Sequence, residues 1–291
     1  MPVLYSYTAM IPSILPSTGP IGVFDSGYGG LTILDKIRGL MPEYDYIYLG
    51  DSARCPYGPR SFEVVYEFTL QAVSKLFELG CPLVILACNT ASAKALRTIQ
   101  QINLPVIDAT RRVLGVIRPT AECIGEITRS RHVGILATAG TIKSESYLLE
   151  IHKLSPDIVV TGEACPMWVS LVENNEYQSE GADYFVKQHI NRLLDKDPMI
   201  DTIILGCTHY PLLRSRIMAY FGESVHIVNP AYETAMDLKQ ILEEQKIANT
   251  SGEPAAYDFY VSDAAEKFKK FANSILPYDV DKTQAIDIED Y

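Results

Sequence analysis

Short apolar runs alternate with longer amphipathic segments along most of the chain, beginning at Gly22. Runs this short that carry no polar face predict strands buried on both sides, and the amphipathic segments Ser61–Leu79 and Ala182–Leu194 predict helices. Strands that alternate with helices predict an α/β fold with mainly parallel sheets. The predicted strands are Ile21–Phe24, Tyr46–Leu49, Leu83–Ala87, Pro105–Ile107, Val133–Ala137, Ile158–Thr161, Thr202–Leu205 and Val225–Val228.

The two ends of the chain have patterns of their own. The first twenty residues contain no charged side chain and are interrupted by prolines, which predicts an irregular arm. Toward the C-terminus, Tyr232–Glu244 predicts a helix, a polar break follows at Asn249–Gly252, and Tyr257–Val261 predicts a short strand. We expect this last part to pack back on the first half of the chain.

The loops that follow the strands repeat weakly between the two halves. Leu83–Leu86 leads into Cys88, and Thr202–Leu205 leads into Cys207. Because ligands bind beyond the carboxyl ends of parallel strands, this repeat predicts two similar α/β domains that face each other across a cleft, with one thiol from each. The predicted parts are an N-terminal arm (1–20), a first domain (21–117 plus 229–291) and a second domain (118–228).

The charge and cysteine content limit the possible partners. A formal net charge of −11 argues against nucleic acid, and no apolar run is long enough to cross a membrane. An anionic substrate would therefore need local donors. The six cysteines form no C-x-x-C pair and match no zinc ribbon or small disulfide scaffold. Because the first twenty residues lack the basic n-region of a signal peptide, we expect a cytoplasmic protein with reduced thiols.

Cys88 and Cys207 are the strongest candidates for chemistry. Each follows a buried strand and precedes a predicted helix start, where the helix dipole lowers a thiol pKa. A cysteine is more often a small buried hydrophobic residue, as we expect for Cys81, Cys123 and Cys165. His209, two residues after Cys207, is either structural or exchanges a proton with that thiol. A metal site would need further ligands that are not evident nearby, so we expect none.

Other loops supply polar groups suited to an amino acid. Asp25 and Ser26 follow the first strand and could form an N-cap and tight turn, or relay a proton from a thiol. Arg54–Gly58 has turn composition, and its backbone amides could clamp a carboxylate beneath Tyr57. Neutral donors are supplied by Ser26, Asn89, Thr90, Thr138 and Thr208.

Four segments closely resemble the signature segments of the glutamate racemases, and they occur in the order of that family. The resemblance extends from about Ile21 to beyond Ser262. The four segments are Val23–Leu31, Tyr48–Gly58, Ala87–Ala93 and Leu205–Leu213.

The resemblance implies interconversion of L- and D-glutamate without pyridoxal phosphate or another cofactor, which supplies D-glutamate for peptidoglycan. It implies that Cys88 deprotonates D-glutamate, assisted by Asp25, and that Cys207 deprotonates L-glutamate, assisted by His209. It also implies that Glu173 occupies the position of an assisting acidic residue. It further implies eight substrate-binding positions, which are Asp25, Ser26, Tyr57, Gly58, Asn89, Thr90, Thr208 and His209. We add Thr138, one of the neutral donors, to this predicted set.

The chain departs from the family pattern at three places. Cys55 replaces a small aliphatic residue, Ser52 replaces a threonine, and Asp108–Arg112 resembles extra chain before Val113. Cys55 beside the carboxylate clamp could alter affinity or sensitivity to oxidation.

Three other functions remain open at this stage. A racemase for aspartate or a related small molecule is the nearest, although His209 favours glutamate because aspartate-type relatives tend to carry a carboxylate there. A non-catalytic amino-acid-binding protein would need neither thiol. A cysteine-nucleophile hydrolase would use Cys207 with His209 and leave Cys88 idle. We expect a small-molecule substrate and a homodimer.

Overall fold

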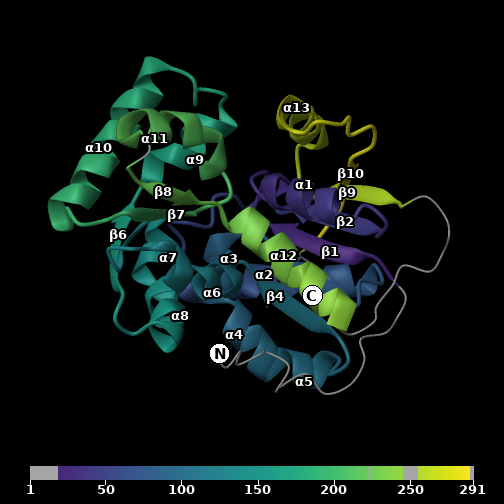
Figure 1. The fold of residues 1–291 in the computed structure, drawn as a ribbon. Coiled ribbons are helices and arrows are strands. Elements are labelled where there is room, and N and C mark those ends of the chain that lie inside the picture. Colours follow the sequence, from purple (N-terminus) through teal and green to yellow (C-terminus); the bar gives the residue numbers. More distant parts are fainter. Residues whose placement is uncertain (1–18, 223, 245–254, 289–291) are drawn as a thin grey trace.

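The computed structural model describes residues 19–222, 224–244 and 255–288. The predicted N-terminal arm up to residue 18 and the predicted polar break at 249–252 lie outside this range. The described chain forms two halves that lie side by side, each built around its own sheet (Figure 1). Among the described residues, no helix is both long enough and apolar enough to cross a membrane.

The first half contains a six-stranded sheet with the order β10-β9-β2-β1-β3-β4, in which every neighbouring pair is parallel. The pairing of β9 with β2 confirms that the C-terminal part packs back on the first half. The strands are β1 (Ile21–Asp25), β2 (Tyr46–Gly50), β3 (Leu83–Leu86), β4 (Arg112–Gly115), β9 (Tyr257–Val261) and β10 (Gln284–Ala285).

The second half contains a four-stranded parallel sheet with the order β6-β5-β7-β8. Two parallel sheets with helices on both faces confirm the predicted α/β class. The strands are β5 (His132–Ala137), β6 (Val159–Ala164), β7 (Thr202–Gly206) and β8 (His226–Val228).

Helices cover both faces of each sheet, which explains why the strands are apolar on both sides. In the first sheet, Val23 of β1 packs in a core with Leu34 and Leu238, and the next residue, Phe24, packs on the opposite face with Val73. In the second sheet, Trp168 and Ile190 fill one face, and a separate core covers the other.

The helices of the first half include α12, which returns from the second sheet to pack against α1. They are α1 (Leu31–Leu40), α2 (Phe62–Glu78), α3 (Asn89–Lys94), α4 (Leu96–Thr98), the π-helix η2 (Ile99–Asn103), α5 (Leu104–Ile107), α12 (Pro230–Glu244) and α13 (Ala265–Ile275).

The remaining helices belong to the second half of the chain. They are α6 (Ile117–Ile127), α7 (Ala139–Lys143), α8 (Ser146–Leu154), α9 (Pro166–Glu173), α10 (Glu180–Lys196), the 3-10 helix η3 (Tyr210–Leu213) and α11 (Arg214–Phe221). The strands of the two sheets fall within the predicted domain ranges, 21–117 with 229–291 and 118–228, and we propose these ranges as the domain bounds.

One predicted strand is wrong. Pro105–Ile107 lies in helix α5, where Val106 is 85% exposed. The neighbouring strand is β4, which includes Arg112 and so overlaps the segment that we interpreted as extra chain. A short apolar run cannot distinguish a helix from a strand by its period, and β4 is alternately buried because it lies at the edge of its sheet.

Candidate active site

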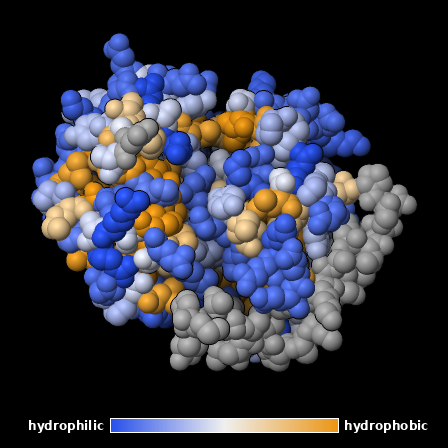
Figure 2. Space-filling view, viewed as in Figure 1, coloured by the Kyte–Doolittle hydropathy of each residue, from blue (hydrophilic) through white to orange (hydrophobic). Residues whose placement is uncertain are grey.

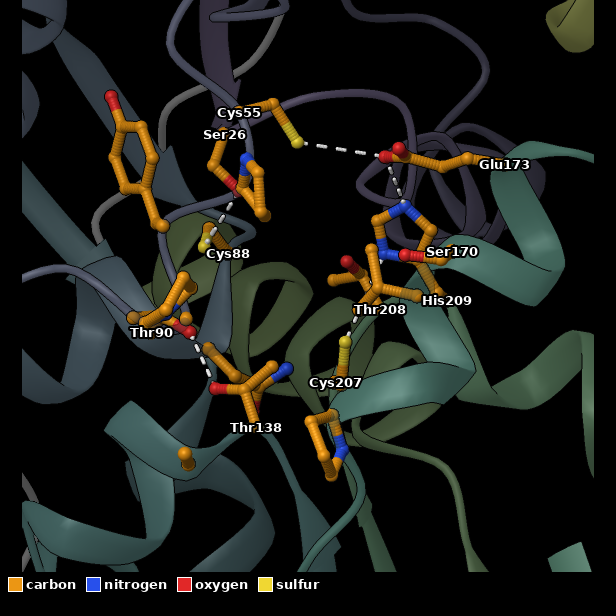
Figure 3. Close-up of a pocket in the computed structure, with 18 residues that line it drawn as sticks. Ser26, Cys55, Cys88, Thr90, Thr138, Ser170, Glu173, Cys207, Thr208 and His209 are labelled. Carbon is orange, nitrogen blue, oxygen red and sulfur yellow. Dashed lines mark hydrogen bonds and ion pairs between the residues drawn. The ribbon is translucent and has the colours of Figure 1, made fainter. Parts of the chain in front are cut away.

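The loops after five strands, β1, β2, β3, β5 and β7, meet at one cavity between the two halves (Figure 3). Strands β1 and β3 are neighbours in the first sheet, and β5 and β7 are neighbours in the second. Cys88 follows β3, Thr138 follows β5, and Cys207 follows β7, so all three side chains lie beyond carboxyl ends of parallel strands. The cavity encloses about 190 Å³.

Most of the predicted site residues line this cavity. They are Ser26, Tyr57, Gly58, Cys88, Asn89, Thr90, Thr138, Glu173, Cys207, Thr208 and His209. Asp25 does not line it. Its carboxyl group is completely buried behind the cavity wall.

Several residues that line the cavity were not predicted from the sequence. Pro166, Val169 and Ser170 lie on α9 and line the cavity together with Glu173. Their spacing of three and four residues places them on one helical face, and this pattern could have revealed them from the sequence. The other lining residues that were not predicted are Cys55, Pro56, Pro59 and Ala139.

Cys88 is the N-cap of α3, as its position predicts. Its Sγ accepts a hydrogen bond from Ala91 N at 3.4 Å, and its thiol donates to Ser26 Oγ at 3.3 Å. The expectation of a lowered pKa is nevertheless wrong for this thiol. Burial, followed by the charge of Asp25, raises the pKa of Cys88 to about 12 and outweighs the two hydrogen bonds. Cys88 is therefore a neutral thiol.

Asp25 connects the two halves behind the thiols. One carboxyl oxygen accepts from Gly27 N at 2.9 Å, and the other accepts from Thr208 Oγ1 at 3.4 Å. Burial raises the pKa of Asp25, although the nearby His209 opposes this effect. Its charge in turn favours the protonated form of Cys88.

Cys207 lies at one end of a polar chain. His209 Nδ1 lies 3.8 Å from Cys207 Sγ, and His209 Nε2 donates to Glu173 Oε1 at 3.0 Å. Burial disfavours the charged imidazole, but Cys207 and Glu173 together raise the pKa of His209 to about 10. Near neutral pH, His209 is therefore an imidazolium, which stabilises negative charge on the sulfur beside it.

The loop at residues 51–58 is held by a buried carboxylate. Asp51 accepts hydrogen bonds from Arg54 Nε at 2.7 Å, from the Tyr57 hydroxyl at 2.5 Å and from Ser262 Oγ at 2.8 Å. The hydroxyl of Tyr57 is thus bound to Asp51. This arrangement fixes the neighbouring Gly58 at the cavity wall.

Neutral donors and a close backbone contact join the two halves around the cavity. Thr90 Oγ1 from the first half lies 2.9 Å from Thr138 Oγ1 of the second. Gly29 packs so tightly against Thr208 and His209 that a Cβ atom at this position would lie 2.5 Å from His209 Nδ1. Only glycine fits such an approach without displacing the imidazole.

The described residues contain no group of three or more His, Cys, Asp or Glu side chains arranged to hold a metal ion. The chemistry that the arrangement offers is that of the two thiols that follow β3 and β7, Cys88 and Cys207, at one small cavity. One thiol is neutral, and the other lies beside an imidazolium.

Comparison with known proteins reveals extensive similarity. The sequence profile of the Asp/Glu/hydantoin racemase family matches residues 32–237. A glutamate racemase from Enterococcus faecalis is 40% identical over 267 residues, which are 91% of this chain and 95% of the relative.

Two crystal structures extend the similarity to the fold. A glutamate racemase isoform from Bacillus anthracis has a TM-score of 0.85 at 36% identity, covering 93% of this chain and 98% of that chain. The glutamate racemase from Francisella tularensis, in complex with D-glutamate, has a TM-score of 0.86 at 32% identity, covering 94% of this chain and all of that chain.

Proposed function

The chain belongs to the Asp/Glu/hydantoin racemase family, and we propose that it interconverts L- and D-glutamate with Cys88 and Cys207 as the two proton-transfer groups. The observation that carries the assignment of residues is that both thiols line one cavity, each from a different half. The activity supplies D-glutamate for peptidoglycan.

In the direction from L- to D-glutamate, the Cys207 thiolate removes the proton from Cα. The electron pair of the broken C–H bond is held at Cα and in the α-carboxylate, and the Cys88 thiol then donates its proton to the opposite face. The product has inverted configuration, Cys207 is now a thiol and Cys88 a thiolate. The reverse reaction exchanges the two roles.

The neighbours of each sulfur support these roles. The imidazolium of His209, paired with Glu173, stabilises the thiolate of Cys207 before it accepts the proton. Burial and Asp25 keep Cys88 protonated, as a donor requires. The two sides of the cavity therefore differ: an imidazolium lies beside the sulfur of Cys207, whereas the thiol of Cys88 keeps its proton.

Glutamate brings two carboxylates into a protein of net charge −11. Hydroxyl and amide groups of the lining, such as those of Ser26, Asn89 and Thr138, supply donors without adding charge. When aimed at the α-carboxylate inside a small cavity, such donors stabilise the negative charge that develops there as the proton leaves.

Serine substitutions test the assignment of the two thiols. Cys88→Ser and Cys207→Ser should each reduce racemisation of both enantiomers by at least about a thousandfold, because a hydroxyl is a far weaker acid than a thiol. Circular dichroism of the amino acid measures the rate. Cys123→Ser, on α6 and outside the cavity lining, is the control and should keep full activity. Full racemisation by either cavity variant would refute the assignment.

The same assay decides between glutamate and aspartate. The chain should racemise glutamate and leave aspartate essentially unchanged, as the similarity to glutamate racemases supports. Binding of glutamate with no turnover would instead favour a non-catalytic binding protein.

We also propose a cytoplasmic homodimer. All six cysteines are free, and a reducing compartment would keep them so. The exposed apolar side chains Ile102, Val106 and Ile107 on η2 and α5 offer surface that an assembly would bury. Sedimentation velocity should give twice the chain mass of 32.4 kDa, and sedimentation as a single chain would reject the dimer.

A further inference from the structure

The cavity contains a third thiol, Cys55, which two-base proton transfer does not use. Its Sγ lies 3.5 Å from Glu173 Oε1, within the range of a hydrogen bond to sulfur. Figure 3 shows this thiol directed toward Glu173, which belongs to α9 of the other half. The contact therefore links the loop at residues 51–58, in the first half, to helix α9 in the second half.

One carboxylate oxygen of Glu173 serves two donors. Oε1 accepts from the imidazole of His209 at 3.0 Å and also lies within reach of the Cys55 thiol. Gly27 makes room for this arrangement, because a Cβ atom there would lie 3.1 Å from Cys55 Sγ and 3.5 Å from Glu173 Oε1. A continuous series of polar contacts thus links Cys55, Glu173, His209 and Cys207.

The thiol of Cys55 can only act as a donor in this series of contacts. Burial, followed by the charges of Glu173 and Asp25, raises the pKa of Cys55 far above its ordinary value, so the sulfur keeps its proton. A protonated donor on a carboxylate oxygen shares the negative charge of that oxygen. Less of this charge is then available to the imidazolium of His209.

We propose that Cys55 is a positioning residue, whose thiol donates to Oε1 of Glu173, orients that carboxylate and limits the charge that it presents to His209. Any effect of Cys55 on racemisation rests on the proposed function, whereas the hydrogen bond between Cys55 and Glu173 does not. Loss of the thiol should therefore raise the pKa of His209, and serine, which keeps a donor, should restore it.

Other charged groups surround these four side chains, and substitution of Cys55 does not remove any of them. His209 is faced by Cys207, Glu173 and Asp25. Glu173 is also within the field of Lys267, whose ammonium group lies 5.7 Å from the ring centre of Tyr28. A change at Cys55 alters only the donor on Oε1.

The experiment is a titration of His209 by NMR in the full chain labelled with ¹⁵N at histidine, with His209→Asn used only to assign the signal. Cys55→Ala should shift the titration of His209 to higher pH, and Cys55→Ser should leave it at the wild-type value or below. Identical titrations for the wild type and Cys55→Ala would overturn the proposal. So would an equal shift in Cys55→Ala and Cys55→Ser, because a purely structural role would not depend on the donor.

Two controls keep the result interpretable. Cys123→Ser removes a thiol outside the cavity lining and should leave the titration of His209 unchanged. Cys55→Val fills the same space without a donor, so it replaces Cys55→Ala if that variant fails to fold, with the same expected shift. The titration needs no turnover. A shift at His209 combined with full racemisation by Cys88→Ser would reject the proposed function and leave the role of Cys55 in place.

Discussion

At the scale of single residues, the two thiols that we propose as proton-transfer groups differ in what surrounds them. Burial and Asp25 keep Cys88 neutral, whereas Cys207 lies beside the charged His209. The sequence predicts that both cysteines lie at a cavity, because each follows a buried parallel strand. It does not predict this asymmetry, because the degree of burial and the contact between His209 and Glu173 depend on how the two halves pack.

The Glu173→Gln variant tests this electrostatic account through stability. The pKa of His209 is raised from an ordinary value of 6.5 to about 10. The stabilisation from charged His209 is therefore complete below about pH 6.5 and is lost as the pH rises through about 10. Glutamine removes the carboxylate charge and lowers this pKa.

Thermal unfolding curves should show the largest difference in melting temperature between wild type and Glu173→Gln near pH 6. The difference should shrink steadily as the pH approaches about 10.5. Glu176→Gln, just beyond α9 and exposed, is the matched control and should show no such trend. A difference between wild type and Glu173→Gln that stays constant over this range would contradict the account.

At the scale of elements, buried strands were predictable and the edge of the first sheet was not. Apolar runs such as Val133–Ala137 mark central strands because both faces are covered. Strand β4 alternates in burial and includes Arg112, so its pattern does not stand out, and the apolar run of α5 resembles a strand more closely. Loops that depend on one buried side chain, such as Asp51, cannot be inferred from local sequence.

The Tyr57→Phe variant tests whether Asp51 organises the loop at residues 51–58. Removal of the hydroxyl should lower the free energy of unfolding by about 2 kcal/mol, the cost of a buried hydrogen bond to a charged group. Because Cys55 and Gly58 lie on the same loop, KM for glutamate should rise more than kcat falls. Denaturant unfolding and steady-state kinetics measure the two effects.

Tyr66→Phe is the matched control for this loop. The Tyr66 hydroxyl donates to Asn103 Oδ1 at 2.9 Å in a partly buried contact outside the cavity lining. Its removal should cost less than about 1 kcal/mol and leave KM unchanged. Equal effects of the two substitutions on KM would show that the Asp51 contact does not position the loop.

At the scale of the whole molecule, the site exists only where the two halves meet. Most of the face seen in Figure 2 is hydrophilic, and hydrophobic side chains gather mainly on the half with the second sheet and where the halves adjoin. The weak repeat along the chain predicts two facing halves with a thiol from each. The contacts between them, including Gly29 against His209, arise from tertiary packing and leave no local signal.

The Gly29→Ala variant tests the importance of this close approach. The added methyl group would collide with His209 and Thr208 and push the two halves apart. Because a displacement of about 1 Å can cost about a hundredfold in rate, racemisation should fall by that order. Gly39→Ala lies in α1, where a Cβ atom meets nothing within 4 Å, and it should keep full activity. Full activity of Gly29→Ala would contradict the requirement for tight contact.

The origin of the transferred proton tests the two-base account most directly. L-Glutamate is converted in deuterated water and stopped at low conversion, and the α-position of each enantiomer is analysed by mass spectrometry after chiral separation. We predict that the D-glutamate formed carries deuterium at Cα, delivered by Cys88, and that the remaining L-glutamate keeps its original proton. D-Glutamate that retains the substrate's own α-proton would show that a single group moves it between faces, and would contradict the account.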